Sequence, residues 1–174
     1  MTGNEALATY LQDHLAGAAH ALDLLEHMSK QHAREPLGEF SRAMFVEISA
    51  DRDILSELAE RIGAGSSGLK VVVSRFGEKM SWLKLNDHGA VSFETFEALE
   101  FLVLGIHGKR ALWRALAVAQ ATDPRLQVMD YSRLEVRAAK QERQVEEQRI
   151  ALAETVLRPD DRRGFGPLGE PETV

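Results

Sequence analysis

Apolar residues recur in the N-terminal part of this chain at alternating steps of four and three, and this spacing restricts the chain to long packed helices. Residues on such a seam share one face of a helix that packs along its neighbours. The seam residues are Leu7, Leu11, His14, Ala18, Ala21, Leu25 and Met28, followed by Leu37, Phe40, Met44, Ile48, Asp51, Leu55, Leu58 and Ile62. We therefore expect two long helices, over 4–29 and 36–62, joined by a short polar link.

The residues that flank these two stretches are typical of helix ends. Thr2 and Glu5 are spaced as a capping box before the first helix. Pro36 suits the first turn of the second helix, where a missing N–H costs nothing. Gly63 stands where a left-handed residue commonly ends a helix.

A longer connection follows, and then two more helical stretches. The connection has a Gly/Ser-rich loop at 64–68 and apolar residues at helical spacing over 69–83, which predict a short helix. The run Val71–Val73 leaves a strand open as the alternative. A third long helix is expected from Ser92, a capping residue, to about Ala121.

The fourth helix is predicted to start at Asp123-Pro124 and to continue to Leu157, because a capping carboxylate before a proline is a strong start signal. Its inward face carries Leu134, Ala138, Gln141, Val145, Gln148, Leu152 and Val156. The remainder, 158–174, is charged and rich in Pro and Gly, so we expect a flexible tail.

Four helices of roughly 25 to 33 residues are rods of about 38–50 Å. Rods of this length with short links within each pair form an antiparallel four-helix bundle. The predicted fold is therefore all-α and covers residues 1–157 as one domain: two helical hairpins joined by a crossover that contains a short fifth helix.

The composition excludes several classes of protein. Apolar residues make up 44% and charged residues 28%, as in ordinary globular proteins. The net charge of −6 argues against nucleic acid as the main partner, and no apolar run is long enough for a membrane span. The absence of cysteine excludes thiol catalysis and thiolate metal sites. With no secretory signal at the start, we expect a cytoplasmic protein.

The layout resembles the ferritin-like superfamily over residues 4–157. Leu58-Ala59-Glu60-Arg61-Ile62-Gly63 looks like the end of a second helix of that family, and Trp113-Arg114-Ala115-Leu116 resembles the Tyr-x-Ala-Leu stretch of its third helix. Asp123-Pro124 resembles the turn before its fourth helix. The short crossover helix is similar to that of bacterial stress-associated ferritin-like bundles. The resemblance implies a bacterial, stress-related bundle.

The metal ligands of that family do not carry over to this chain. Its best-known members bind two irons through two copies of Glu-x-x-His, whereas no glutamate here has a histidine three residues later. At the matching positions stand Ile48 with Asp51, Ala138 with Gln141, and Ile106. Isoleucine has no ligand atom, so we expect that the conventional di-iron site has been lost.

Four residues are nevertheless candidates for an unusual metal site. Asp51 lies in the middle of an apolar seam, where a buried carboxylate needs an arginine, a histidine, a hydroxyl or a metal. His14 is inward on the first helix, Glu47 lies at the edge of the apolar seam of the second, and His107 lies with Glu100 on one side of the third. Two hypotheses stay open for Asp51: a structural ion pair or hydrogen bond, or a metal ligand or general base. Lys109-Arg110 is interpreted as an isolated basic pair without a role.

The third long helix has apolar residues on two sides. One face carries Leu99, Leu102, Ile106, Trp113 and Ala117, which would place Glu100 and His107 outward, and a second carries Phe93, Phe101, Leu104, Leu112 and Ala115. A helix that is hydrophobic nearly all round is usually buried nearly all round. We expect the second face to pack against the crossover helix or against another copy of the chain, as in a homodimer.

Three functional hypotheses follow. The first is a structural protein or oligomer that kept a ferritin-like frame, needs no cofactor and is not an enzyme. The second is a metal-binding or oxidoreductase bundle that uses iron or another divalent metal at Asp51 and His14. The third is an adaptor or stress protein that binds a partner helix through the third long helix. Fold alone does not decide between them.

Overall fold

The computed structural model describes residues 2–64 and 93–158 of the chain. Within these ranges there are four long helices, α1 (Gly3–Gln31), α2 (Pro36–Arg61), α4 (Phe93–Ala119) and α5 (Tyr131–Val156), together with a short 3-10 helix, η1 (Pro124–Leu126). The predicted helix over 69–83, the alternative strand at Val71–Val73, the Ser92 cap and residues 159–174 of the tail lie outside the described residues. The all-helical prediction is confirmed for the described part of the chain.

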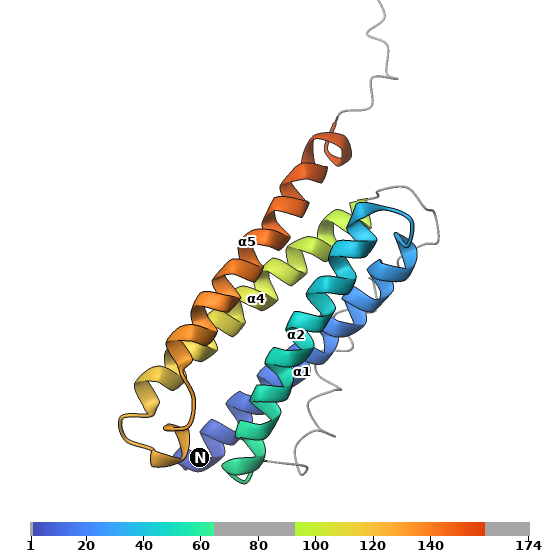
Figure 1. The fold of residues 1–174 in the computed structure, drawn as a ribbon. Coiled ribbons are helices and arrows are strands. Elements are labelled where there is room, and N and C mark those ends of the chain that lie inside the picture. The colour runs from blue at the N-terminus through green and yellow to red at the C-terminus, as the bar shows by residue number, and fades with distance from the viewer. Residues whose placement is uncertain (1, 65–92, 159–174) are drawn as a thin grey trace, which may run out of the picture.

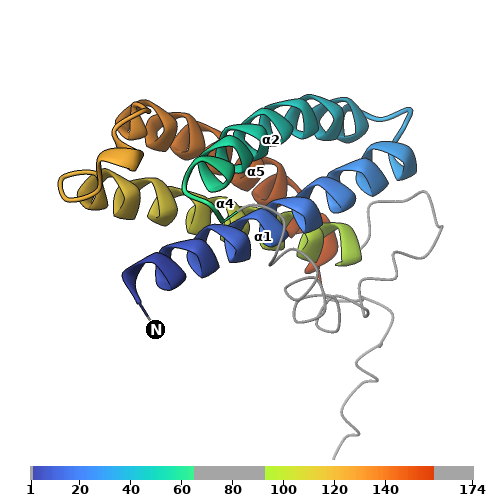
Figure 2. The same ribbon diagram turned by 90° about the horizontal axis from the view of Figure 1, so that it is seen from below.

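The helices are arranged as two pairs. α1 packs against α2 and α4 packs against α5, and the chain reverses direction within each pair (Figure 1). The pairs meet where α1 lies against α4, and α1 crosses α4 in the view of Figure 2. The backbones of α2 and α5 approach each other less closely than the members of either pair do.

The ends of α1 and α2 follow the signals in the sequence. The Thr2 side chain accepts a hydrogen bond from the Glu5 backbone N–H at 3.3 Å, and Glu5 Oε2 accepts one from the Thr2 N–H at 2.8 Å, which completes the predicted capping box. Pro36 occupies the first turn of α2. Gly63 has a φ of 78°, the left-handed conformation expected after α2.

The predicted start of the fourth helix is wrong. Asp123 and Pro124 begin η1, in which the Asp123 carboxylate accepts a hydrogen bond from the backbone N–H of Arg125. The chain turns again after η1, and α5 begins at Tyr131 with the Asp130 side chain capping the Arg133 N–H at 2.9 Å. The Asp-Pro signal therefore belongs to a single tight turn.

One hydrophobic core runs between the four helices. Its fully buried members include Leu11 and Leu25 of α1, Leu58 of α2, Leu99 of α4 and Val145 of α5. The positions that would hold metal ligands in the resembled family are part of the interior: Ile48 is 3%, Ile106 2% and Ala138 0% exposed. These three residues were expected on inward faces, and the burial confirms this.

The two apolar faces expected on the third long helix differ in burial. Leu112 of the second face is part of the core, whereas Phe93 is 53% and Leu104 61% exposed in the single chain. Glu100 and His107 are exposed, as expected. No helix within the described ranges has the length and apolar character needed to cross a membrane.

Candidate functional site

The candidate site is built around Asp51, whose side chain is only 3% exposed in the middle of α2. Its Oδ2 accepts a hydrogen bond from the Nζ of Lys109 on α4, and its Oδ1 forms an ion pair with the guanidinium of Arg137 on α5. The expectation that a carboxylate buried here would meet an arginine or another polar partner is confirmed. A pair of cations, from two different helices, neutralises it.

Lys109 extends this arrangement into a chain of polar contacts. Its Nζ also donates to Oε1 of Gln141 at 2.5 Å, and the Nε2 of Gln141 donates to Oε2 of Glu47 at 3.1 Å. We call Glu47, Asp51, Lys109, Arg137 and Gln141 the central network. It joins α2, α4 and α5, and its long side chains span the wider gap between α2 and α5.

The charges of the central network balance. Glu47 and Asp51 each carry one negative charge, and Lys109 and Arg137 each carry one positive charge. Burial lowers the pKa of Lys109 from its ordinary value of 10.5, and the neighbouring Asp51 carboxylate opposes that shift. A buried charge is costly unless it is paired and hydrogen-bonded, and here each of the two buried charges, Asp51 and Lys109, has two partners.

The donor set at this position does not fit a di-iron centre. Such a centre needs several carboxylates and imidazoles that converge on two cations. Here the ammonium of Lys109 lies between Asp51 and Gln141, and like charges repel, so a metal cation would have to displace it. Among the residues that the structure describes, no three His, Asp or Glu side chains form a group that could hold a metal ion.

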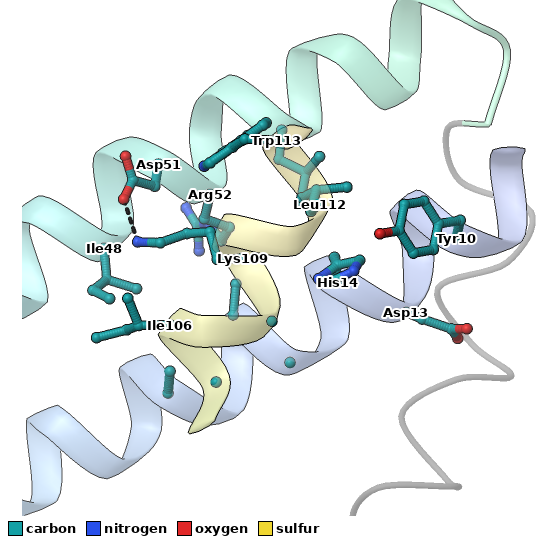
Figure 3. Close-up of a pocket in the computed structure, with 16 residues that line it drawn as sticks. Tyr10, Asp13, His14, Ile48, Asp51, Arg52, Ile106, Lys109, Leu112 and Trp113 are labelled. Atoms are coloured by element: carbon teal, nitrogen blue, oxygen red, sulfur yellow. Dashed lines mark hydrogen bonds and ion pairs between the residues drawn. The ribbon is translucent and has the colours of Figure 1, made fainter. Parts of the chain in front are cut away.

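A cavity of about 400 Å³ opens beside the central network, between α1, α2 and α4 (Figure 3). Asp51 and Lys109 line one part of it, and His14 lines another part. The His14 ring packs edge-on against Tyr10 with ring centroids 4.8 Å apart. Burial lowers the pKa of His14 from its ordinary value of 6.5, opposed by the nearby Asp13 carboxylate.

The four predicted site residues therefore separate into three places. Asp51 and Glu47 belong to the central network and are linked through Lys109 and Gln141. His14 shares the cavity with Asp51, and within the described residues no hydrogen bond or ion pair joins the two.

His107 points away from both the network and the cavity. Its side chain is 66% exposed, and its Nδ1 lies 3.3 Å from Oε1 of Glu142 on α5. Glu142 also accepts a hydrogen bond from Arg110 at 3.0 Å, and Arg110 donates to Glu135 at 2.8 Å. These contacts form a partly exposed row of ion pairs between α4 and α5.

Sequence reasoning missed the role of Lys109. The interpretation of Lys109-Arg110 as an isolated basic pair is wrong, because Lys109 pairs with Asp51 and Arg110 with Glu135 and Glu142. A usable signal was present in the seam spacing. Leu102, Ile106, Lys109, Trp113 and Leu116 recur at steps of four and three, which puts a lysine on the inward face of the third long helix.

Sequence reasoning placed Trp113 on an apolar face of the third long helix and gave it no other role. Its side chain is 1% exposed and lines the cavity. Its indole Nε1 is buried without a hydrogen-bond partner among the described residues. Buried N–H donors in folded proteins are nearly always paired, so the unpaired indole N–H of Trp113 is an exception to that rule.

Comparisons of this chain with protein-family models, with curated proteins and with solved structures find no match.

Proposed function

We propose that this chain is an antiparallel, ferritin-like four-helix bundle in which the central network has replaced the metal centre. It serves as a non-catalytic structural or interaction protein in the bacterial cytoplasm, with a role in stress like that of the bundles whose layout it resembles. The reversal of direction within each helix pair supports this assignment (Figure 1). The apolar side chains of Ile48, Ile106 and Ala138, at positions where the resembled family has ligands, support the loss of the metal.

The observation that carries the proposal is the place of the Lys109 ammonium. It contacts both Asp51 and Gln141, the two polar residues at the matching ligand positions. A protonated lysine in that position supplies one positive charge without redox chemistry and without an exchangeable ion. The bundle then keeps the stabilising electrostatics of a central cation and loses the reactivity of a metal.

Metal analysis of the purified protein tests this proposal. The chain would be produced in medium supplemented with iron and manganese, purified without chelator, and analysed by mass spectrometry of the elements. We expect far less than one metal ion per chain. One or more bound ions per chain, lost in Asp51→Asn, would overturn the proposal and favour a metal-binding or oxidoreductase bundle at Asp51 and His14.

We also propose that the chain forms a homodimer through the second apolar face of α4. Phe93 and Leu104 are large apolar side chains that are more than half exposed on this helix, and exposed apolar surface of this kind is typical of interfaces. Light scattering after size exclusion should give twice the mass of the chain. Leu104→Glu should give monomers, whereas Val136→Glu, at a residue of similar exposure on α5, should leave the dimer intact. A monomeric wild-type chain would overturn this part of the proposal.

A further inference from the structure

A row of apolar and small residues follows the outer side of α4. Its members recur at alternating steps of three and four along the helix, and most of them are exposed in the single chain. We call them the outer seam: Phe101, Leu104, Gly108, Ala111, Ala115 and Val118. Residues at this spacing form one narrow stripe on a helix, which is the pattern of a surface that packs along a second helix in a coiled coil.

The outer seam exposes large apolar side chains toward both of its ends. In the single chain Phe101 is 37%, Leu104 61% and Val118 76% exposed. A continuous exposed apolar stripe of this kind is typical of a contact surface. The outer seam includes Leu104, so it continues the face of α4 through which we propose that the chain forms a homodimer.

Exposed apolar residues on α5 do not form a comparable stripe. Val136 is 66% and Ile150 55% exposed. Arg143 and Glu146 lie between them at the spacing that puts all four on one side of the helix. None of the six residues of the outer seam is charged, so α4 offers the surface that can be buried without loss of hydration at a charge.

The side chains of the outer seam are sorted by size along α4. The large residues Phe101 and Leu104 come first, and the small residues Gly108, Ala111 and Ala115 follow. Two packed helices fill the space between them best when a large side chain on one faces a small side chain on the other. The outer seam is therefore complementary to a copy of itself that is turned end to end.

A two-fold axis midway along the outer seam produces that arrangement, because it brings the same surface of two copies together in opposite directions. Leu104 then faces Ala115 of the partner subunit, and Phe101 faces Val118 of the partner subunit. Gly108 faces Ala111 of the partner subunit, which lets the two helices approach closely at the centre.

A parallel arrangement fits less well. It would place each residue of the outer seam against its own copy, so that Phe101 and Leu104 crowd one end while Ala111 and Ala115 leave space unfilled in the other half. Glu97, four residues before Phe101 on the same stripe, would also face the same carboxylate of the second copy, and like charges at that position repel. The antiparallel arrangement separates the two Glu97 side chains to opposite ends of the contact.

We infer that the outer seam of α4 packs against the outer seam of a second copy of this chain in the antiparallel direction, with Leu104 against Ala115 of the partner subunit. This inference rests on the proposed homodimer, and it adds the direction of the two helices and the pairing of their residues.

The absence of cysteine from the chain allows a direct test by disulfide cross-linking. Two full-length variants, Leu104→Cys and a tagged Ala115→Cys, would be co-expressed and mildly oxidised. We expect a disulfide-linked heterodimer, because a disulfide joins residues whose Cα atoms lie about 4.4–6.8 Å apart. Neither variant alone should cross-link, since the antiparallel arrangement separates the two copies of either residue by about 16 Å along the helix.

A second pair and a control complete the cross-linking experiment. Phe101→Cys and Val118→Cys should also cross-link only with each other. Val136→Cys, at a residue of similar exposure to Leu104 but on α5, is the matched control. It should form no disulfide with Leu104→Cys or with Ala115→Cys.

The dependence of the dimer on side-chain size gives an independent measurement. Ala115→Leu puts a leucine against Leu104 of the partner subunit and should weaken the dimer about tenfold, as overpacking does. The double variant Ala115→Leu with Leu104→Ala exchanges the large and small members of the pair and should recover most of the loss. In a parallel dimer Ala115→Leu would instead fill space and tighten the dimer, which would overturn the inference.

Failure of the homodimer and failure of the antiparallel pairing give different results. A monomeric wild-type chain in light scattering overturns both. A dimer in which Leu104→Cys cross-links with itself keeps the homodimer and overturns the antiparallel pairing. A dimer in which neither cysteine pair on α4 cross-links forms through another surface, and that result overturns the inference as well.

Discussion

Lys109 of α4 and Asp51 of α2 form an ion pair in the interior of the protein, with side chains 14% and 3% exposed. The two residues lie 58 positions apart in the sequence, and their contact joins the first helix pair to the second. On α5, Arg137 forms an ion pair with Asp51, and Gln141 accepts a hydrogen bond from Lys109. The ammonium of Lys109 therefore links residues from three of the four long helices.

Loss of the Lys109 charge should destabilise the fold. In Lys109→Met the carboxylate of Asp51 stays buried with one cation fewer, and we expect the free energy of unfolding to fall by about 3 kcal/mol. Urea titration followed by circular dichroism measures this. Lys140→Met, at an exposed lysine on α5, is the matched control and should change the free energy by less than about 0.5 kcal/mol.

Gly38 should not tolerate a side chain. A Cβ atom at this position would overlap the backbone carbonyl of His32, with 2.6 Å to its carbon, so the link between α1 and α2 would have to move. We expect Gly38→Ala to lower the free energy of unfolding by about 2 kcal/mol, as overpacking does.

The control for Gly38→Ala is the same change at Gly17. That glycine lies within α1, and a Cβ there meets no atom within 4 Å. Because alanine is the better helix former, Gly17→Ala should raise the free energy of unfolding by about 0.5–1 kcal/mol. Equal effects of the two substitutions would contradict the tight approach at Gly38.

The burial of His14 should make stability depend on pH. Its pKa in the folded chain lies below the ordinary value of 6.5, so just below pH 6.5 the unfolded chain binds more protons than the folded chain does. The free energy of unfolding should therefore not change through His14 above about pH 6.5, and it should fall as the pH drops from 6.5 toward the pKa of His14 in the folded chain. Urea midpoints measured between pH 7.5 and about 5 should show a smaller decline in His14→Gln than in the wild type.

The matched control is His27→Gln, which removes an exposed histidine from the same helix. The readout is the difference in decline between the two variants. If both variants follow the same curve, His14 is not the source of the dependence.

The start of α5 can be tested at its cap. Asp130 accepts the backbone N–H of Arg133, so Asp130→Ala should lower the free energy of unfolding by about 1 kcal/mol. Asp130→Asn, which keeps an acceptor at the cap, should recover most of that loss. No recovery in Asp130→Asn would mean that the carboxylate acts there through its charge rather than as a cap.

Much of the fold follows from local rules. The seam spacing predicts the helices, and Thr2, Pro36 and Gly63 mark ends that the structure confirms. The start of α5 did not follow, because Asp123-Pro124 begins a tight turn as readily as a helix. A local signal such as Asp-Pro indicates that a helical turn begins. The packing of the residues that follow decides whether that turn continues into a long helix.

The site was predictable to a smaller extent. Asp51 stands out in the sequence because a carboxylate on an apolar seam must find a partner. The seam spacing places Lys109 on the inward face of α4, but its pairing with Asp51 depends on the register of α4 against α2, which no local pattern encodes. That Trp113 Nε1 is buried without a partner among the described residues depends on the position of a single atom, so only the folded structure shows it.

A double-mutant cycle between Asp51 and Lys109 measures how strongly these two residues depend on each other. The free energy of unfolding would be measured for the wild type, Asp51→Asn, Lys109→Met and the double variant. We predict a coupling free energy of about 2 kcal/mol, with the double variant less destabilised than the sum of the two single changes. Additive effects, with a coupling near zero, would contradict the claim that this ion pair holds the centre of the bundle.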